Sequence, residues 1–441
     1  MKRSKNPARR AWRRAMTCIA AAAAVVSAPQ AGAVIPESVA QQAGLTRAWF
    51  TQAPIDAATQ QIHAAVLSDG VIYVLTSAGN VQALDAETGA PKWRRRYGDR
   101  LAPVAGPTVE GNRLAIVVGS TAFLIDAETG AQVLAKQLDG APGGAPAIGE
   151  EYLLTPLLGG RLVAHPIDYQ AALPFRIASP GTVLGNPVVA SGRVVWSTVE
   201  GMVYTAAIDS GVPSYRFDAA ARLSGAPIVD AEQMYFATTA GFVYAMQTET
   251  GRVVWRRAIE GSVEKPLVEV ADTIYVTAAT PSLHALSRET GQIRWNVEGV
   301  SDFAAASEKR VYALAPGGAL AVLDRETGEP VASWPAVEPL RAIPNNETDR
   351  IYVMSDSGLI QCFHEAGADE PFRHRPSEET EPKADAPAET TPADEPDTTA
   401  PEPIPGFGEP PAESPDATDP FGDLAPAEDS GDADADNPFD F

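Results

Sequence analysis

The sequence predicts an all-β fold, an eight-bladed β-propeller of four-stranded blades, closed by its N-terminal strand and followed by a disordered acidic tail. Three observations lead to this prediction. A unit of about 40 residues recurs along the chain, each unit contains four short strand patterns, and the strand that the last unit lacks stands near the N-terminus. Repeats of this kind are typical of propeller blades, of which a ring has roughly four to eight.

The most regular part of each unit is a tight turn that ends in Thr-Gly. The first copy is Asp85-Ala86-Glu87-Thr88-Gly89, followed by Trp93. An Asp or Ser side chain can bond the backbone ahead of it, and Gly supplies the positive φ that closes the hairpin. The Trp begins a strand and offers a large apolar face to the neighbouring unit. Related turns recur at Asp126–Gly130, Asp209–Gly211 with Tyr215, Thr248–Gly251 with Trp255, Ser287–Gly291 with Trp295, Asp324–Gly328 with Trp334 and, in reduced form, Glu365–Gly367.

Two further strand patterns precede the turn in each unit. One opens with a Pro in most units, where the missing N–H interrupts no hydrogen bond, and the next centres on a residue such as Tyr73 or Tyr235. Apolar residues alternate or form short runs, as in half-buried or buried strands, and helical periodicity is absent. The opening residues are Pro107, Pro146, Pro187, Pro227, Pro266 and Pro344, with Ala65 and Ala304 in the other two units.

The two ends of the repeat predict how the ring closes. Eight strands of the Tyr type alternate with only seven of the Trp type, and the last unit stops after Cys362. The segment Arg47–Thr51 resembles the strand of Trp93 but has no unit of its own. We therefore expect it to complete the last blade, which pairs both ends of the repeat. Seven blades is the alternative count, because the third unit, near Asp168-Tyr169, has no Gly in its turn.

The first 33 residues have the features of a secretory signal peptide. A basic segment, Lys2–Arg14, precedes an apolar stretch, Cys18–Ala28, and Ala31-Gly32-Ala33 offers a small-residue cleavage site. The apolar stretch is shorter than the ~20 residues that span a bilayer. We expect a periplasmic or secreted protein. The pair Arg13-Arg14 leaves open whether export uses the general or the twin-arginine route.

These patterns set the expected domain boundaries. Residues 1–33 form the predicted signal peptide, 34–44 an N-terminal linker, 45–365 the propeller and 366–441 a tail rich in Pro, Asp and Glu. The tail has too few apolar residues to bury a core, so we expect it to be disordered. Signal cleavage would leave Cys362 as the single Cys, which excludes an intrachain disulfide.

Charge is distributed unevenly along the chain. Residues 1–33 carry +7 and residues 365–441 carry −20, so the total of −23 leaves −10 for residues 34–364. Without the first segment the chain would carry −23 − 7, or −30. Nucleic acids and anionic membrane surfaces are polyanions, so the net charge disfavours both and favours basic proteins or cations as partners.

The sequence contains no recognisable active-site pattern. It has no Gly-x-Ser-x-Gly elbow, phosphate loop or EF-hand. Its five His do not stand at metal-ligand spacing, and the loose pair Cys362 and His364 is too few ligands for a site. Acidic pairs such as Glu150-Glu151 are interpreted as solvated hairpin tips. We therefore predict no catalytic, cofactor-binding or metal-binding residues.

Surface loops on a rigid ring are the expected place for contacts with partners. Arg94-Arg95-Arg96 is the one basic cluster after the predicted signal peptide and a candidate partner-binding site. The alternative interpretation is a set of charges that protects an exposed strand edge.

The acidic tail contains two similar short sequence motifs, Asp419-Pro420-Phe421-Gly422-Asp423 and Asn437-Pro438-Phe439-Asp440-Phe441. An Asx-Pro turn that displays a Phe between acids can enter a pocket of a partner. Phe421, Phe439 and Phe441 are therefore candidate contact residues. The alternative interpretation is a tail that only solubilises or spaces the protein.

The repeated Ala-Leu-Asp-x-Glu-Thr-Gly-x-x-x-Trp, first seen at Ala83–Trp93, resembles the tryptophan-docking repeat of the pyrroloquinoline-quinone-like (PQQ-like, quinoprotein-like) propellers. The resemblance covers about residues 45–364. That family includes quinone-dependent alcohol and sugar dehydrogenases and the eight-bladed propeller subunit of the outer-membrane β-barrel assembly machinery. The sequence lacks the adjacent Cys pair of the alcohol dehydrogenases, a Cys-x-x-Cys-His haem site and a lipid-modification site like that of the assembly subunit.

The resemblance implies a non-enzymatic scaffold with protein partners, in cell-envelope or outer-membrane assembly. We expect a monomeric propeller that binds no nucleic acid or cofactor and has no transmembrane segment after signal cleavage. One alternative is a dehydrogenase that holds PQQ and calcium in a divergent site. Another is a propeller that binds glycans or peptides, which the sequence does not separate from a scaffold because both would use surface loops.

Overall fold

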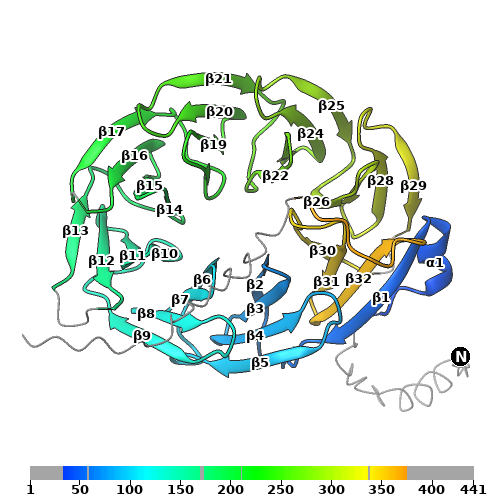
Figure 1. Cartoon of the computed structure of the whole chain (residues 1–441), viewed down its shortest axis with the longest axis horizontal. Coiled ribbons are helices and arrows are strands. Elements are labelled where there is room, and N and C mark those ends of the chain that lie inside the picture. The colour runs from blue at the N-terminus through cyan, green and yellow to red at the C-terminus, as the bar shows by residue number, and fades with distance from the viewer. Residues whose placement is uncertain (1–32, 57–58, 169–172, 210, 336–337, 375–441) are drawn as a thin grey trace, which may run out of the picture. The chain divides into compact units, whose positions relative to one another are not determined.

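The computed structural model describes residues 33–56, 59–168, 173–209, 211–335 and 338–374. They form a ring of eight four-stranded sheets, as the sequence predicted (Figure 1). The predicted signal peptide, apart from Ala33, and the tail beyond His374 lie outside the described residues. No helix in the described part of the chain is long and apolar enough to cross a membrane.

Each sheet is antiparallel, and its strands follow one another from the central channel to the outer wall. The inner strands of blades 3 to 6 have only two or three residues, whereas those of blades 1 and 2 have seven. From inside to outside, blade 1 contains β2 (Ile62–Ser68), β3 (Val71–Thr76), β4 (Asn80–Asp85) and β5 (Pro91–Arg96); blade 2 contains β6 (Val104–Glu110), β7 (Arg113–Val118), β8 (Thr121–Asp126) and β9 (Gln132–Gln137); blade 3 contains β10 (Ala147–Ile148), β11 (Tyr152–Leu157), β12 (Arg161–Pro166) and β13 (Phe175–Ala178); and blade 4 contains β14 (Val188–Ala190), β15 (Arg193–Ser197), β16 (Met202–Ala207) and β17 (Pro213–Asp218).

The other four blades repeat this order, except that the last takes its outer strand from the N-terminus. Blade 5 contains β18 (Ile228–Val229), β19 (Gln233–Ala237), β20 (Phe242–Gln247) and β21 (Val253–Ala258); blade 6 contains β22 (Val268–Val270), β23 (Thr273–Ala278), β24 (Ser282–Ser287) and β25 (Ile293–Glu298); blade 7 contains β26 (Asp302–Ala306), β27 (Arg310–Leu314), β28 (Leu320–Asp324) and β29 (Pro330–Trp334); and blade 8 contains β30 (Leu340–Ile343), β31 (Ile351–Ser355), β32 (Leu359–Glu365) and β1 (Leu45–Gln52).

The predicted closure is therefore confirmed. Strand β1 pairs antiparallel with β32 from Leu45 opposite Glu365 to Gln52 opposite Leu359. The degenerate third unit still forms a complete blade, so the ring has eight blades and not the alternative seven. Sequential hairpins supply the other sheets, and only the last sheet needs strands from both ends of the described chain.

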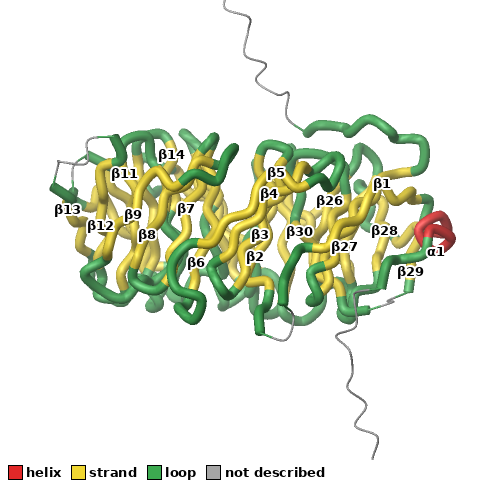
Figure 2. The backbone as a smooth tube through the Cα atoms, turned by 90° about the horizontal axis from the view of Figure 1, so that it is seen from below, coloured by secondary structure: helices red, strands yellow, loops and turns green. Residues whose placement is uncertain are grey.

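The strands run between two faces of the ring that are lined with loops (Figure 2). The turn face, as we name it, holds the loop between the first and second strands of each blade and the Thr-Gly turn between the third and fourth. Ala86 N–H, for example, bonds Gly70 O at 2.9 Å between two such loops. The connection face holds the remaining loops, where Tyr97 N–H bonds Gly79 O at 2.9 Å.

The predicted Trp packs on the Thr-Gly turn of the next blade, as expected. The indole of Trp49 in blade 8 covers Gly89 in blade 1, and its Nε1–H donates to Ala86 O at 3.0 Å. The positive φ of the Gly and its missing Cβ allow this close approach. The same contact joins Trp93 to Gly130, Tyr215 to Gly251, Trp255 to Gly291 and Trp295 to Gly328.

The assignment of Trp334 to this role is wrong. Trp255 and Trp295 pair with Ala245 and Ala285, but the equivalent partner in blade 7, Val322, pairs with Ala332. Trp334 lies two residues further on, where its buried ring packs against Phe363 with centroids 4.9 Å apart. Trp334 was assigned to this role because the loop and strand around it contain no other aromatic residue.

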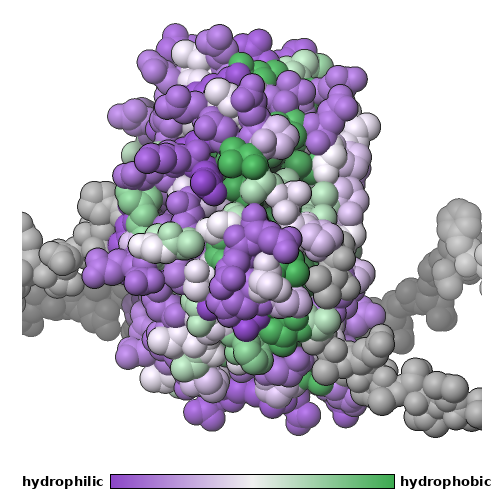
Figure 3. Space-filling model, turned by 90° about the vertical axis from the view of Figure 1, so that its right-hand side faces the viewer, coloured by the Kyte–Doolittle hydropathy of each residue, from purple (hydrophilic) through white to green (hydrophobic). Residues whose placement is uncertain are grey.

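A short helix, α1 (Glu37–Gln42), covers the position where this Trp is missing. Val39 and Ala40 belong to the same apolar cluster as Ala332 and Trp334, and Ile35 in that cluster is fully buried. Ile35 N–H donates to Gln361 Oε1 at 3.0 Å, which ties the segment to β32. Residues 34–44 were expected to be a linker, but they complete the packing between blades 7 and 8. Figure 3 shows this side of the ring, whose surface is mainly hydrophilic with separate apolar patches.

Two of the predicted strand-opening Pro residues lie elsewhere. Pro107 is inside β6, at a bulge between Ala105 and Thr108, where the ladder is already interrupted. Pro344 follows β30 instead of opening it. Pro146, Pro187 and Pro227 directly precede the inner strands of blades 3, 4 and 5, as predicted.

The first residues assigned to the tail pack on blade 8. Arg350, which is 2% exposed, donates from its guanidinium to Ala368 O at 2.9 Å and Asp369 O at 2.6 Å. Phe372 N–H donates to Asp349 Oδ1 at 3.1 Å, and His374 N–H to Glu347 O at 2.9 Å. The packed chain thus extends nine residues beyond the boundary expected at residue 365, because a buried Arg can bond backbone carbonyls whatever side chains they bear.

Substitution of Gly89 tests the docking contact. A Cβ at Gly89 would lie 2.4 Å from Trp49 Cε3, whereas a Cβ at Gly70 would meet nothing within 4 Å. The φ values of the two residues are nearly equal, +69° and +70°, so the backbone cost of Ala is the same, roughly 1 to 2 kcal/mol. We expect Gly89→Ala to lose about 2 kcal/mol more stability than Gly70→Ala in denaturant unfolding. Equal losses would contradict the docking role.

Candidate functional site

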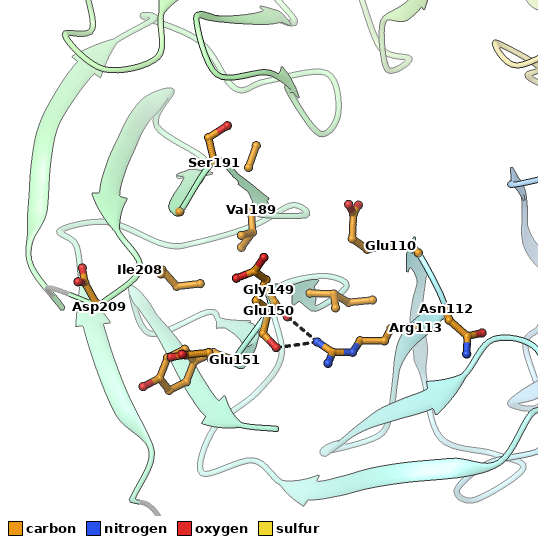
Figure 4. Close-up of a pocket in the computed structure, with 15 residues that line it drawn as sticks. Glu110, Asn112, Arg113, Gly149, Glu150, Glu151, Val189, Ser191, Ile208 and Asp209 are labelled. Atoms are coloured by element: carbon orange, nitrogen blue, oxygen red, sulfur yellow. Dashed lines mark hydrogen bonds between the residues drawn. The ribbon is translucent and has the colours of Figure 1, made fainter. Parts of the chain in front are cut away.

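The clearest candidate site is a cavity of about 810 Å³ on the turn face, between blades 2, 3 and 4. Three neighbouring loops surround it, each joining the first and second strands of its blade (Figure 4). They contribute Glu110–Arg113 from blade 2, Ile148–Tyr152 from blade 3 and Val189–Gly192 from blade 4. Ile208 and Asp209 add the turn that follows β16 of blade 4.

The cavity combines apolar residues with carboxylates. Ile148 is buried, and Val189 and Ile208 are partly buried, so aliphatic groups form part of its wall. Carboxylates come from all three blades: Glu110, Glu150, Glu151 and Asp209. The cavity can therefore contact the aliphatic part of a side chain and attract a positive charge at its end.

Arg113 is the one cation among the described residues that line the cavity, and it bridges two blades. Its Nη1 donates to Gly149 O at 3.0 Å and to Glu150 O at 2.7 Å (Figure 4). The equivalent residue of blade 4, Arg193, reaches only its own blade, at Ser214 Oγ, 3.4 Å away. Arg113 thus fixes the loop of blade 3 and leaves the carboxylates of Glu150 and Glu151 for other contacts.

Local burial also changes the charge balance of the cavity. Desolvation, with a smaller contribution from Asp69, raises the pKa of Glu110 above its ordinary value. The ionised form of a carboxyl in such surroundings gains from an added positive charge. A cationic group of a partner would supply that charge.

A second cavity, of about 590 Å³, lies in the central channel. Its lining is mostly apolar, comes from the inner strands of blades 1, 5 and 6 and from residues that follow the inner strand of blade 8, and includes Asp230 and Glu269. Arg288 pairs with both of them, and its Nε lies 2.8 Å from Glu269 Oε1. PQQ is a polycarboxylate, so the two carboxylates would repel it and the nearby cation is already engaged. These residues do not fit the quinone.

The pair Cys362 and His364 lies on β32, inside blade 8. Cys362 is 1% exposed and packs with Trp49 and Tyr352, and burial raises the pKa of its thiol. His364 bonds through Nδ1 to Glu365 O at 2.9 Å. Within the described ranges, no three His, Cys, Asp or Glu residues are grouped to hold a metal ion.

The sequence-predicted contact residues do not meet in one site. Arg94, Arg95 and Arg96 are exposed on β5, the outer strand of blade 1, and do not line the cavity of Figure 4. Phe421, Phe439 and Phe441 lie outside the described residues.

Sequence reasoning identified Glu150-Glu151 as a hairpin tip but missed the cavity that these residues line. The two residues do lie in the loop between β10 and β11, and both are exposed. Acids near these loops are visible in the sequence, but they do not single out the cavity, because Asp69, Asp230, Asp272 and Glu308 occupy the corresponding loops of blades 1, 5, 6 and 7. Only the packing of three blades side by side turns these loops into one cavity.

Comparison with known proteins places the fold in a family. Four overlapping segments, residues 12–167, 106–265, 190–306 and 240–355, match the PQQ-like family model described as outer membrane protein assembly factor BamB. Together they span residues 12–355, well over half of the 441 residues. No curated protein sequence matches the chain.

Solved structures agree on the fold. BamB from Moraxella catarrhalis is 16% identical, with a TM-score of 0.55, and the match covers 73% of this chain and 99% of that one. The computationally designed protein Ika8 is 14% identical, with a TM-score of 0.55 over 69% of this chain and 96% of that one. The C-terminal WD40 domain of Sif2 is 12% identical, with a TM-score of 0.55 over 73% and 98%.

At these identities the structural matches speak for the propeller alone, whereas the family model matches the repeats themselves. The docking residues and the eight-bladed ring closed by β1 agree with the resemblance that the repeat suggested. The chain therefore belongs to the PQQ-like propeller family described as outer membrane protein assembly factor BamB.

Proposed function

We propose that the protein is an exported, monomeric propeller of the cell envelope that acts as a non-enzymatic scaffold for protein partners in outer-membrane protein assembly. Membership of the BamB family supports this role. The observation that carries the proposal is the turn-face cavity, which three blades build on a closed ring. Such a cavity can receive a protruding segment of a folded partner without a large conformational change.

The chemistry of the cavity favours a segment with a basic residue. Glu110, Glu150, Glu151 and Asp209 surround it, and Arg113 is engaged with backbone carbonyls. A Lys or Arg side chain could place its stem against the aliphatic wall and its charge among the carboxylates. Charged groups at such a surface contribute strongly to partner choice and to the rate of association.

Charge reversal in the cavity tests the scaffold proposal. We expect Glu150→Lys combined with Glu151→Lys to lower recovery of crosslinked partners from native envelopes by at least tenfold, because like charges would meet a basic segment. Crosslinking, purification of the chain and quantitative mass spectrometry measure the recovery.

The matched control is Glu249→Lys with Glu289→Lys, which makes the same charge change at exposed turns of blades 5 and 6. We expect that control to keep recovery within about twofold. Equal loss of recovery in both variants would argue against the cavity as the binding site. Recovery of the chain as a lone monomer would argue against the scaffold role.

Export is part of the proposal. A cleavage site after Ala33 predicts that the protein purified from cells begins at Val34. Sequencing of its N-terminus makes the test, and a chain that still begins at Met1 would contradict export by a cleaved signal peptide.

A quinone titration separates the scaffold from the alternative dehydrogenase. Because Asp230 and Glu269 would repel a polycarboxylate, we expect no stoichiometric binding when the mature, metal-stripped protein is titrated calorimetrically with PQQ and calcium. Tight binding together with substrate-dependent dye reduction would show that the protein is an enzyme and would contradict the proposed scaffold function. Saturable binding of a glycan without turnover would favour the binding-module alternative.

A further inference from the structure

The outer strand of blade 1 concentrates positive charge. Strand β5 has the sequence PKWRRR, and Lys92, Arg94, Arg95 and Arg96 are all exposed. Arg100 follows in the loop on the connection face and is also exposed. We name these five residues the basic patch.

Protection of a strand edge does not require so much charge. The seven other outer strands of the ring also form sheet edges, with α1 packed against β1 and β29, yet each has no more than two basic residues: one each in β1, β9, β13, β17 and β25, two in β21 and none in β29. Since those edges do without a cluster, the four charges of β5 need another explanation.

The arginines of the patch are not neutralised by neighbours. Among the described residues, no ion pair involves Arg94, Arg95 or Arg96. By contrast, Arg176 on β13 pairs with Asp139 at 2.6 Å, and Arg294 on β25 pairs with Asp272 at 2.6 Å. The patch therefore presents its charge to solvent.

An apolar residue projects beside these charges. Leu101 directly follows Arg100 and is 92% exposed. The turn that displays it is held by Leu101 N–H on Asp99 Oδ1 at 3.0 Å, and Arg100 Nη2 donates to Thr59 Oγ1 at 2.9 Å. An exposed Leu beside a row of cations is the combination that favours a lipid–water interface, where the cations meet anionic headgroups and the Leu enters the boundary layer.

We infer that the basic patch docks the protein on an anionic phospholipid bilayer. The cations would attract anionic headgroups, and burial of Leu101 in the boundary layer would add a smaller apolar contribution. An acidic protein segment would satisfy the arginines but would leave Leu101 in water, so the bilayer is the better fit. This inference uses the proposed envelope location and goes beyond the proposed scaffold role.

The net negative charge of the chain does not oppose such docking. At physiological salt, charges act over only about 8 Å, so the local patch decides and the sum over the chain does not. In blade 1, Asp69 and Glu87 lie in loops of the turn face and Asp85 ends β4 there, whereas the patch continues onto the connection face. Asp99 lies beside Arg100 in the loop of the patch, where its Oδ1 accepts from Leu101 N–H, so the patch has more cations than acids. The expectation that anionic membranes are disfavoured was based on total charge and did not take this separation into account.

Vesicle binding by the full mature chain tests the inference. We expect flotation with vesicles of phosphatidylglycerol and phosphatidylethanolamine, none with phosphatidylcholine vesicles, and release at about 0.5 M salt. Arg94→Gln with Arg95→Gln and Arg96→Gln should weaken binding by about two orders of magnitude. Leu101→Gln should weaken it by about tenfold, and Lys at all three Arg positions should preserve it within about threefold.

The matched control is Lys136→Gln with Arg176→Gln and Arg216→Gln, the same charge change on β9, β13 and β17. It should keep the affinity within about threefold. The inference is overturned if the unmodified chain does not bind anionic vesicles. It is overturned as well if the control substitutions weaken vesicle binding as much as the substitutions in the basic patch. It is also overturned if soluble polyglutamate binds through the same arginines while vesicles do not. None of these outcomes depends on partner capture at the cavity, so the scaffold proposal is tested separately.

Discussion

The ring depends on one repeated contact, the packing of an aromatic ring on the Thr-Gly turn of the following blade. The Gly brings its backbone against the ring face, and the indole N–H bonds a carbonyl in the same turn, as Trp93 Nε1 does with Ala127 O at 2.8 Å. The contact joins large apolar surfaces and also fixes their orientation. It joins five of the eight pairs of neighbouring blades, and closure by β1 requires that all eight interfaces agree.

The exceptions to this contact explain the parts of the chain that do not repeat. Ala332 cannot cover the turn of blade 8, and Gly367 has no atom near its missing Cβ. The chain fills this interface with α1, Ile35 and Trp334, in one cluster with strands of both blades. Tyr312 and Ser307 of blade 7 also bond Glu365 Oε1, at 2.5 Å and 2.7 Å. The N-terminal segment thus has a packing role in addition to supplying the last strand.

A regular ring also creates the surfaces that matter for function. Loops of the same type come together on one face, so carboxylates from adjacent blades share the turn-face cavity although they are about 40 residues apart in sequence. On the outer wall, by contrast, the charges lie close together in sequence, because the cations of β5 belong to one strand. The two surfaces differ in charge and lie on different parts of the ring, so one molecule can use both at once.

The sequence by itself determined the blade count, the four strands per blade, the docking of Trp on Gly and the closure by Arg47–Thr51. These features depend on local turn chemistry and strand pattern, which most of the repeats display again. Only the tertiary structure decided that Ala332 occupies the docking register, that residues 34–44 and 366–374 pack on the ring and that three loops enclose a cavity. Each of these depends on strand register or on contacts between distant segments, and a pattern within a single repeat contains no information about either.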